Sequence, residues 1–164
     1  MNIEEINESQ WESLKSIRLE SLVDSPDAFG ISYEKAKGLT TEAWKLLASG
    51  KLGHKFYIAY GNGSAVGLVG VLNTKDEHEL VSMWVKPAAR RQGVGKKLIK
   101  VLLEQAIAEG HTSIKLKVSS KNRHAYALYT EVGFVETEHK IELESNNDEG
   151  MIEMVWHHKM LLLS

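Results

Sequence analysis

The chain has 164 residues, enough for one domain with its own hydrophobic core, and its 43% hydrophobic and 26% charged residues are typical of globular proteins. A formal net charge of −2 disfavours non-specific nucleic-acid binding, which requires an extended basic surface. The absence of cysteine excludes disulfides and thiolate metal ligands.

No apolar run approaches the roughly 20 residues that span a bilayer. The first ten residues, MNIEEINESQ, are acidic and polar, unlike a secretory signal peptide. We therefore expect a single cytoplasmic domain over residues 1–164, with neither a membrane nor a nucleic acid as partner.

The first half of the chain predicts strands and helices in alternation. Apolar residues at helical spacing indicate a helix that Ser9 caps and that ends near Asp24. Residues 61–64, Gly-Asn-Gly-Ser, predict a tight hairpin because they tolerate positive φ. The other elements expected here are a short edge strand at Ile3–Ile6, a helix within Thr40–Gly50, and the hairpin strands His54–Tyr60 and Ala65–Leu72.

The second half predicts two strand–helix units followed by a terminal hairpin. Pro87 ends the first strand, and Gly110 and Gly133 end the two helices. The elements are a strand at Glu79–Lys86, a helix at Val94–Glu109, a strand at Ser113–Val118, a helix at Asn122–Glu131, and hairpin strands at Phe134–Leu143 and Met151–Lys159. This order indicates a mixed α and β fold.

A basic stretch interrupts this slightly acidic chain. The 24 residues between Glu79 and Glu104 carry six Lys or Arg side chains and no acid. Within it, Gly93 and Gly95 lie where a strand has ended and a helix begins. The first helical turn leaves backbone N–H groups without partners, and the helix dipole adds positive charge there. Because glycine has no Cβ, an anion can approach these donors, so the pattern favours phosphate or pyrophosphate.

Two other phosphate motifs do not fit this stretch. The Walker A pattern requires glycine at the position of Arg90 and Ser or Thr at that of Lys97. The dinucleotide-binding pattern requires glycine where Arg91, Lys96 or Leu98 stands. The alternative to an anion site is a solvated basic helix start with a glycine for packing.

Two motifs together resemble those of a known family. Residues 90–95, Arg-Arg-Gln-Gly-Val-Gly, resemble the pyrophosphate loop of the GNAT superfamily of acyl-CoA-dependent N-acetyltransferases. Residues 122–134, NRHAYALYTEVGF, are similar to the family's other signature, at the expected distance of one helix and one strand. The resemblance is close over residues 79–135. It implies an α/β (mixed α+β) fold, with a central, mostly antiparallel, splayed sheet of about six to seven strands flanked by about four helices.

The resemblance also implies acetyl-CoA as co-substrate. Met83 and Val85 would run beside the pantetheine arm on a bulged strand, and the Val85 N–H would stabilise the oxyanion. Asn122 would fix the pantetheine, cap its own helix, or do both. The residues expected around the pyrophosphate are Arg90, Arg91, Gln92, Gly93, Val94, Gly95 and Lys96. Which basic residue faces the 3′-phosphate stays open.

Two residues are candidates for proton transfer. Tyr129 resembles the general acid that protonates the leaving thiolate, the alternative being a packed core tyrosine. Glu79 stands six residues before Val85, so we expect both side chains on one strand face, a spacing that resembles the base of the histone-acetylating branch. The alternatives are a water chain to solvent and a carboxylate without a role. His78, on the opposite face, is a weaker candidate.

The acceptor is less defined. The family's arrangement implies an acceptor side that includes Arg18, Pro26, Asp27, Phe29 and Tyr33. Convergence of the N-terminal acids with those of the last hairpin would favour a cationic acceptor; otherwise they form a solvated charged face. The hairpin acids are Glu136, Glu138, Glu142, Glu144, Asp148 and Glu149.

The function expected is acetyl transfer from acetyl-CoA to a primary amine on a small molecule or peptide. Without cysteine an acyl-cysteine intermediate is excluded, so the amine would attack directly. We expect no metal, because the His residues lack ligand spacing. A homodimer stays open. Two alternatives are a non-catalytic acyl-CoA sensor and an interaction module with the same fold.

Overall fold

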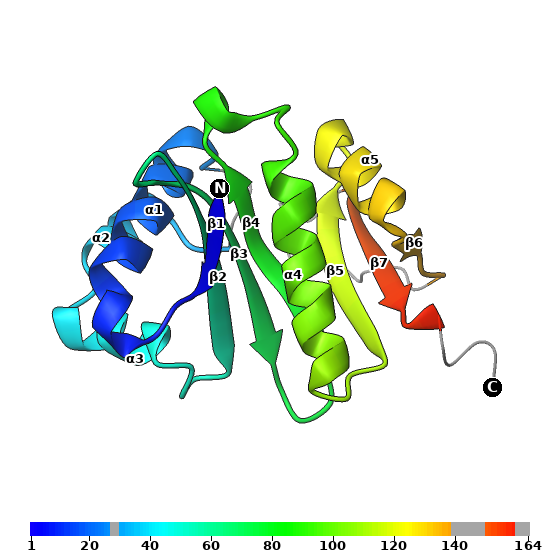
Figure 1. The fold of residues 1–164 in the computed structure, drawn as a ribbon, viewed down its shortest axis with the longest axis horizontal. Helices are drawn as coiled ribbons and strands as arrows, with labels where there is room; N and C mark the ends of the chain where they lie inside the picture. Colours follow the sequence, from blue (N-terminus) through cyan, green and yellow to red (C-terminus); the bar gives the residue numbers. More distant parts are fainter. Residues whose placement is uncertain (27–29, 139–149, 160–164) are drawn as a thin grey trace.

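The computed structural model describes residues 1–26, 30–138 and 150–159. Its centre is a seven-stranded sheet in the order β1-β2-β3-β4-β5-β7-β6 (Figure 1). Neighbouring strands are antiparallel except β4 and β5, which are parallel. The strands are β1 (Asn2–Glu5), β2 (His54–Gly61), β3 (Ser64–Asn73), β4 (His78–Val85), β5 (Ser113–Ser119), β6 (Val135–Glu136) and β7 (Met151–His157). The predicted mixed fold with a mostly antiparallel sheet is confirmed.

The helices of the described residues are α1 (Trp11–Asp24), α2 (Tyr33–Lys37), α3 (Thr41–Ala48), α4 (Val94–Ala108) and α5 (Arg123–Val132), with short 3₁₀ turns at Glu8–Gln10 and Pro87–Ala89. None of them is long and apolar enough to cross a membrane. The first helical segment begins at Asn7 rather than Ser9, because the Asn7 side chain accepts the Ser9 amide while the Gln10 side chain accepts the Asn7 amide. The sequence does not predict α2, whose five residues are too few for a helical repeat.

The β2–β3 hairpin has the predicted turn. Asn62 (φ 53°) and Gly63 (φ 78°) both occupy the left-handed region, the pattern of a type I′ turn. Gly61 and Ser64 pair directly across it. The turn therefore fixes the pairing of the strand ends next to it, and an irregularity between Ala59 and Tyr60 shifts the register of the rest by one residue.

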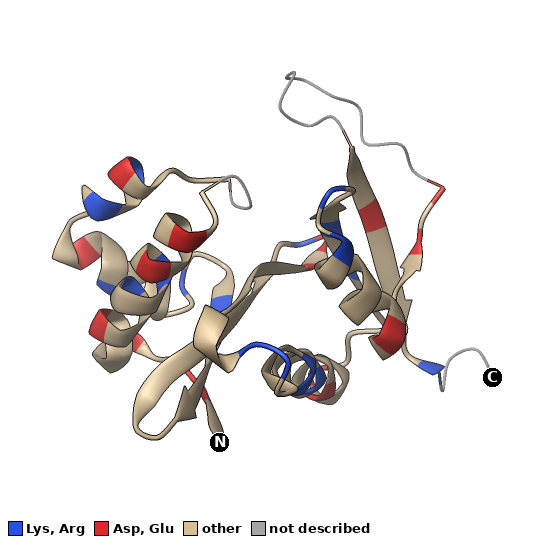
Figure 2. Ribbon diagram, turned by 90° about the horizontal axis from the view of Figure 1, so that it is seen from above, with Lys and Arg blue, Asp and Glu red and all other residues tan. Residues whose placement is uncertain are grey.

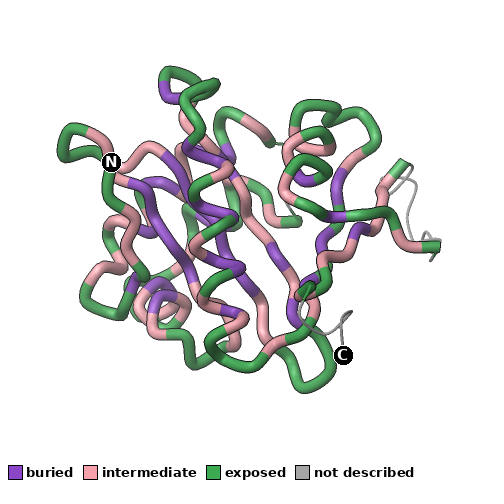
Figure 3. Tube along the Cα trace, turned by 45° about the vertical axis from the view of Figure 1, so that its right-hand side comes forward, coloured by how far each residue is buried: buried purple, intermediate pink, exposed green. Residues whose placement is uncertain are grey.

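Helices cover both faces of the sheet, and each face has its own core. Helices α1 and α3 pack on one face, where Trp44 and Ile58 are fully buried. Helix α4 packs on the other face, where Leu98 and Leu102 are fully buried. Figure 3 shows buried residues along the central strands between these layers. We call the two sides the α1/α3 face and the α4 face.

Strands β4 and β5 separate along their length. Within the described ranges, Glu79 and Lys115 are the one pair that links them. Seen from above, the part of the molecule that contains β5, β7 and α5 diverges from the part that contains β1 to β4 (Figure 2). The splayed sheet that the resemblance implies is therefore present.

Strand β4 contains a bulge at the point of divergence. Leu68 pairs with Trp84 and Gly70 with Val81, so β4 uses three steps where β3 uses two. Ser82 has φ 56° within this step. Because the bulge adds one residue, the side chains of β4 exchange faces across it.

The end of the chain pairs as predicted where it is described. In β6, Val135 faces Val155 of β7. The remainder of the expected hairpin, with its turn at residues 146–148, lies outside the described residues.

Candidate active site

The loop before α4 presents a row of backbone donors. Arg91 (φ 64°) and Gly93 (φ 80°) adopt left-handed conformations that turn the chain into the helix. The amides from Arg91 to Lys96 donate no hydrogen bond to any residue that the structure describes, and the first bond of the helix joins the Lys97 amide to the Gly93 carbonyl. These donors and the positive end of the helix dipole can bind an anion.

The two loop glycines serve different ends. A Cβ on Gly93 would meet nothing within 4 Å, so its positive φ explains the residue. A Cβ on Gly95 would lie 2.9 Å from Cε of Met83 and 3.0 Å from Cδ2 of Leu128. Gly95 therefore lets α4 approach β4 and α5. Close packing is thus a second reason for glycine at 95, and its expected role in admitting the anion stays a prediction.

A cavity of about 840 Å³ opens beside this loop, on the α4 face. The residues predicted for the co-substrate line it, except Gln92, whose side chain donates to the Ala88 carbonyl. Trp84 of the same strand and Ala125 and Leu128 of the second motif line it as well, together with residues that the sequence did not single out: Ser25, Ala89, His124, Ala127 and Glu131. The spacing of Ala125, Leu128 and Glu131 on α5 was the available signal, since residues three apart share a helix face.

The backbone of Val85 points into the gap between β4 and β5. Val85 faces Gly67 of β3, and the next amide, that of Lys86, donates to the Val66 carbonyl. This pattern makes Gly67 and Val85 a non-hydrogen-bonded pair, so the N–H and C=O of Val85 point away from β3. A donor is therefore available where the strands diverge.

Arg90 is held by the protein itself. Its Nε donates to the Val85 carbonyl at 2.9 Å, and its Nη2 lies 2.6 Å from Oδ2 of Asp24 at the end of α1. The same Asp24 oxygen accepts the indole N–H of Trp84 at 2.9 Å. The bonds from Trp84 and Arg90 lower the pKa of Asp24 below its usual value. No local spacing predicts this cluster, because Trp84 and Arg90 lie 60 and 66 residues from Asp24.

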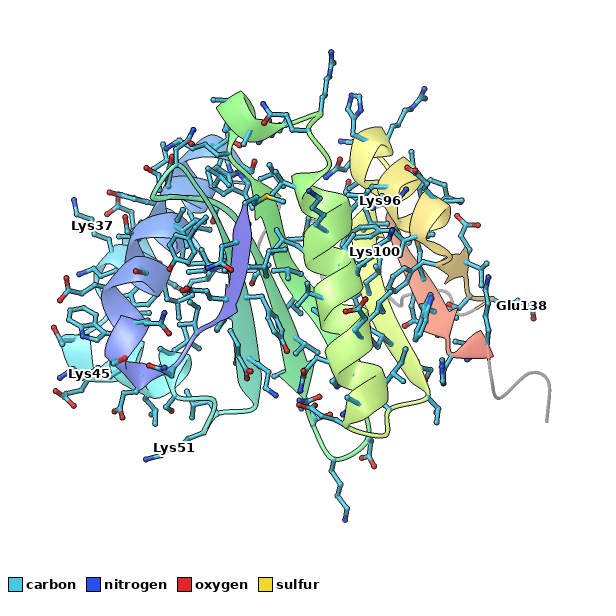
Figure 4. All side chains as sticks on the ribbon, viewed as in Figure 1. Lys37, Lys45, Lys51, Lys96, Lys100 and Glu138 are labelled. Carbon is cyan, nitrogen blue, oxygen red and sulfur yellow. The ribbon has the colours of Figure 1, made fainter. Side chains whose placement is uncertain are left out.

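A second ion pair joins the helices that flank the cavity. Nζ of Lys96 lies 2.8 Å from Oε1 of Glu131, and this bond lowers the pKa of Glu131. Figure 4 shows Lys96 and Lys100 between α4 and α5, and Figure 2 shows the positive charge on the loop and first turn of α4. Lys96 thus faces α5 across the cavity that the loop amides border.

Comparison with known proteins identifies the family of this chain. Its sequence matches the profile of the Acetyltransferase (GNAT) family over residues 11–134, about three quarters of its length. The chain belongs to the GNAT family of acetyltransferases. It is 30% identical over 90 residues to N-acetyltransferase family 8 member 2 of Rattus norvegicus, a match that covers 51% of this chain and 40% of that protein. The chain thus spans about two fifths of the curated relatives that it matches.

Solved structures of GNAT acetyltransferases share the fold. An acetyltransferase of the family from Streptococcus pneumoniae has a TM-score of 0.79 at 20% identity, covering 95% of this chain and 98% of that one. The PaiA N-acetyltransferase of Thermoplasma acidophilum, solved in complex with coenzyme A, has a TM-score of 0.69 at 17% identity and covers 96% and 100%. At these identities the likeness concerns the fold.

In this GNAT protein, Tyr129 lies in the core. Its side chain is 6% exposed and packs edge-on against Phe134, with ring centroids 5.8 Å apart. It is absent from the residues that line the cavity described above, although its neighbour Leu128 lines it. Burial raises the pKa of Tyr129 far above its usual value, so the phenol is protonated at neutral pH. Its role as an acid stays a prediction.

Glu79 does not share a face with Val85. Val85 packs against the core of the α4 face, whereas Glu79 lines a second cavity, of about 440 Å³, on the α1/α3 face. The expected common face was wrong because the bulge at Ser82 adds a residue between them. Burial raises the pKa of Glu79, and nearby Lys117 opposes that rise. His78 is also buried, stacks on His111 and contacts Asn73 at the far end of β4.

The predicted acceptor side is found in part. Arg18 lines the second cavity, whereas Asp27 and Phe29 lie outside the described residues. The acids of the two chain ends do not converge where they are described: Glu136 lies on β6, at the sheet edge opposite β1. The last four of the hairpin acids lie beyond the described part. Among the described residues that line it, the second cavity instead has two cations, Arg18 and Lys117, and one acid, Glu79.

Proposed function

We propose that this GNAT acetyltransferase transfers the acetyl group of acetyl-CoA to a primary amine by direct attack. The observation that carries the proposal is the row of amides from Arg91 to Lys96, which have no hydrogen-bond partner in the described part of the chain and border the same cavity as the outward-pointing backbone of Val85. Such a row suits a pyrophosphate, and the gap beyond Val85 suits an extended chain that ends in a thioester.

The residues of the first cavity fit this co-substrate. The loop amides would bind the pyrophosphate, and the pantetheine would lie along β4 as a neighbouring strand does. The Val85 N–H would face the thioester, since the Val85 carbonyl already accepts Nε of Arg90. Arg91 and Lys96 supply positive charge for the phosphates, whereas Arg90 braces the loop through Asp24. The Asn122 side chain accepts the Ala125 amide and so caps α5, which leaves its amide N–H₂ group as the part that can reach a ligand.

The chemistry that acetyl-CoA supplies is an activated thioester carbonyl. The amine arrives as an ammonium ion and must lose a proton before its lone pair can attack the carbonyl carbon. The C–N bond then forms, the C–S bond breaks, and the Val85 N–H stabilises the negative oxygen between these events. Of the two protons that the ammonium loses, one ends on the CoA sulfur and the other leaves to solvent.

Two side chains are proposed for these proton transfers. Glu79 opens into the second cavity on the face opposite the first, so an amine held there would reach the thioester from the other side of the sheet. Its raised pKa makes it a better base than an exposed carboxylate. Tyr129 keeps its proton at neutral pH and would donate it to the thiolate, provided that its hydroxyl reaches the first cavity from the core.

Ligand-induced stabilisation tests the proposal. Acetyl-CoA at about 1,000 times its dissociation constant should stabilise the fold by roughly 4 kcal/mol and raise the melting temperature by several degrees. NAD and ATP serve as controls, and thiol release with a panel of amines follows. No shift at millimolar acetyl-CoA contradicts the proposal. A higher melting temperature without thiol release from any amine would mean that the protein binds acetyl-CoA but does not transfer the acetyl group, and would contradict the proposed transfer.

A further inference from the structure

The second cavity is built from side chains of the sheet and of the helices on its α1/α3 face. Its apolar wall comes from α3, β2 and the segments on either side of α2, and includes Trp44, Phe56, Ile31, Leu39 and Leu47. Trp44 and Phe56 are buried, at 1% and 4% exposure, so this wall is fixed by the core. A volume of about 440 Å³ is within the range of small-molecule sites.

The cavity adjoins the gap where the strands diverge. Ser82, at the bulge, lines the second cavity, and the next residue, Met83, lines the first. Lys117 of β5 forms part of the wall on the other side of the gap. An amine in the second cavity would therefore lie next to the thioester position without entering the first cavity.

Polar groups of this wall are incompletely partnered. The indole N–H of Trp44 and Nδ1 of His54 are buried and form no hydrogen bond with any residue in the described ranges. His54 stacks on Phe56, and burial together with the charge of Arg18 lowers its pKa, so its ring is neutral at pH 7. Both atoms are enclosed by the protein with almost no exposed surface, so they are not available to a ligand in the cavity.

The charges on the cavity wall indicate which charges a ligand should carry. Arg18 and Lys117 are cations, and Glu79 is the one acid among the lining residues that the structure describes. Desolvation lowers the pKa of Arg18 to about 10, so the guanidinium stays charged at neutral pH in a partly dry site. Its five donors can bind a carboxylate in two-point fashion while serving other acceptors. A polyamine would meet two like charges here.

We infer that the acceptor is a free α-amino acid with an apolar side chain. Its ammonium would lie at Glu79, its carboxylate at Arg18 and Lys117, and its side chain against Trp44 and Phe56. One positive and one negative group match the two cations and one acid of the wall better than a simple amine does. This inference rests on the proposed function and names its substrate class.

Three matched amines test it, with thiol release as the readout. Phenylalanine has the carboxylate, phenylalaninamide replaces it with a neutral amide, and phenethylamine lacks it. We expect kcat/KM for phenylalanine to exceed that of each of the others about 10- to 100-fold, the range of a charge-assisted hydrogen bond. Higher activity on phenylalaninamide would indicate a peptide N-terminus as acceptor and overturn the inference.

Variants separate recognition from folding. Arg18→Gln should lose about 10- to 100-fold in kcat/KM for phenylalanine and change phenethylamine less than threefold, a difference that general damage to the fold would not produce. Arg18→Lys should recover part of that loss, and Lys117→Gln, at an exposed residue, should lose a few fold. Lys45→Gln is the control, because Lys45 projects from the outer side of α3 (Figure 4) and does not line the cavity.

The outcomes distinguish this inference from the proposal beneath it. Equal activity on the three amines, with no effect of Arg18→Gln, overturns the amino-acid acceptor while leaving acetyl transfer intact. Absence of a stabilising shift with acetyl-CoA, or of thiol release with any amine, overturns both. If Arg18→Gln does not fold, the phenylalanine preference of Arg18→Lys and Lys117→Gln decides.

Discussion

The two cavities lie on opposite sides of one sheet and differ in the groups that they offer to a ligand. The first presents main-chain groups, the amides before α4 and the backbone of Val85, beside lining side chains such as Asn122 and Lys96. The second is made from side chains of α1, α3, β2 and the strands next to the gap. Main-chain sites bind what every substrate shares, and side-chain sites bind what differs. The first cavity is thus suited to a constant co-substrate and the second to a particular acceptor.

The largest expected effect comes from replacing Glu79, the one acid that lines the second cavity among the described residues. Glu79→Gln should lower kcat about 100-fold, because a positioned base contributes at least that much. Burial raises the pKa of Glu79 above 4.5, so its activity should rise with pH over a limb above that value, and the variant should lose the limb. The measurement is the pH profile of kcat/KM.

Stability separates this effect from unfolding. A carboxyl whose folded pKa is raised stabilises the fold below pH 4.5, and this contribution is lost as pH rises through the folded pKa. Glu79→Gln should therefore be at least as stable as the wild type at pH 7. Glu77→Gln, at an exposed neighbour, is the control. An unchanged profile in Glu79→Gln would mean that water carries the proton.

Paired glycine variants sharpen the comparison on the other side. Gly93→Ala and Gly110→Ala both place a side chain at positive φ, 80° and 88°, with nothing within 4 Å of the new Cβ. Each should cost about 1–2 kcal/mol of stability. Gly93→Ala alone should weaken acetyl-CoA binding, about tenfold, since its loop amides would turn. Calorimetry and thermal unfolding test this, and equal acetyl-CoA affinities would show that the loop does not bind the co-substrate.

The smallest effect concerns the cluster of Asp24, Trp84 and Arg90 that joins the two regions. Asp24→Asn should cost about 1 kcal/mol or less, since its pair with Arg90 is partly exposed. The lowered pKa means that the contribution of Asp24 is present above pH 3.8 and lost as pH falls through the folded pKa, so the difference from wild type should vanish in acid. Thermal unfolding across pH measures it.

A matched ion pair serves as the control for this cluster. Glu20→Gln removes the pair of Glu20 with Lys86, 3.1 Å apart and also between α1 and the end of β4. It should change stability by no more than a few tenths of a kcal/mol. If Asp24→Asn also weakens acetyl-CoA binding more than threefold, Arg90 contributes to the phosphate site beyond bracing the loop.

The contrast between backbone geometry and side-chain contacts also explains what the sequence could predict. The loop at Gly93 and the helix start at Asn122 leave local signals, because glycine and a capping side chain are required where they stand. The hairpin at Asn62-Gly63 and the helices with clear caps were predictable for the same reason. Where backbone geometry sets the residue, a short stretch of sequence suffices.

What the sequence could not show depends on distance or on a one-residue offset. Asp24, Trp84 and Arg90 meet only through the tertiary fold, so no spacing announces them. The bulge at Ser82 lacks the glycine that often marks one, and the period of two then assigned Glu79 to the wrong face. The acceptor wall gathers residues from 18 to 117 and has no motif.

The bulge also bears on how relatives of this chain are aligned. The extra residue of β4 makes the side chains beyond it exchange faces. A carboxylate that lies an even number of residues from Val85, as Glu79 does, is therefore on the opposite side of the sheet here. In a homologue with a regular strand, the same geometry would require an odd separation. In a sequence alignment, the position of an insertion or deletion near Ser82 therefore decides to which side of the sheet an aligned residue is assigned. Over evolution, a single codon gained or lost at this point would move a carboxylate from one face of the sheet to the other.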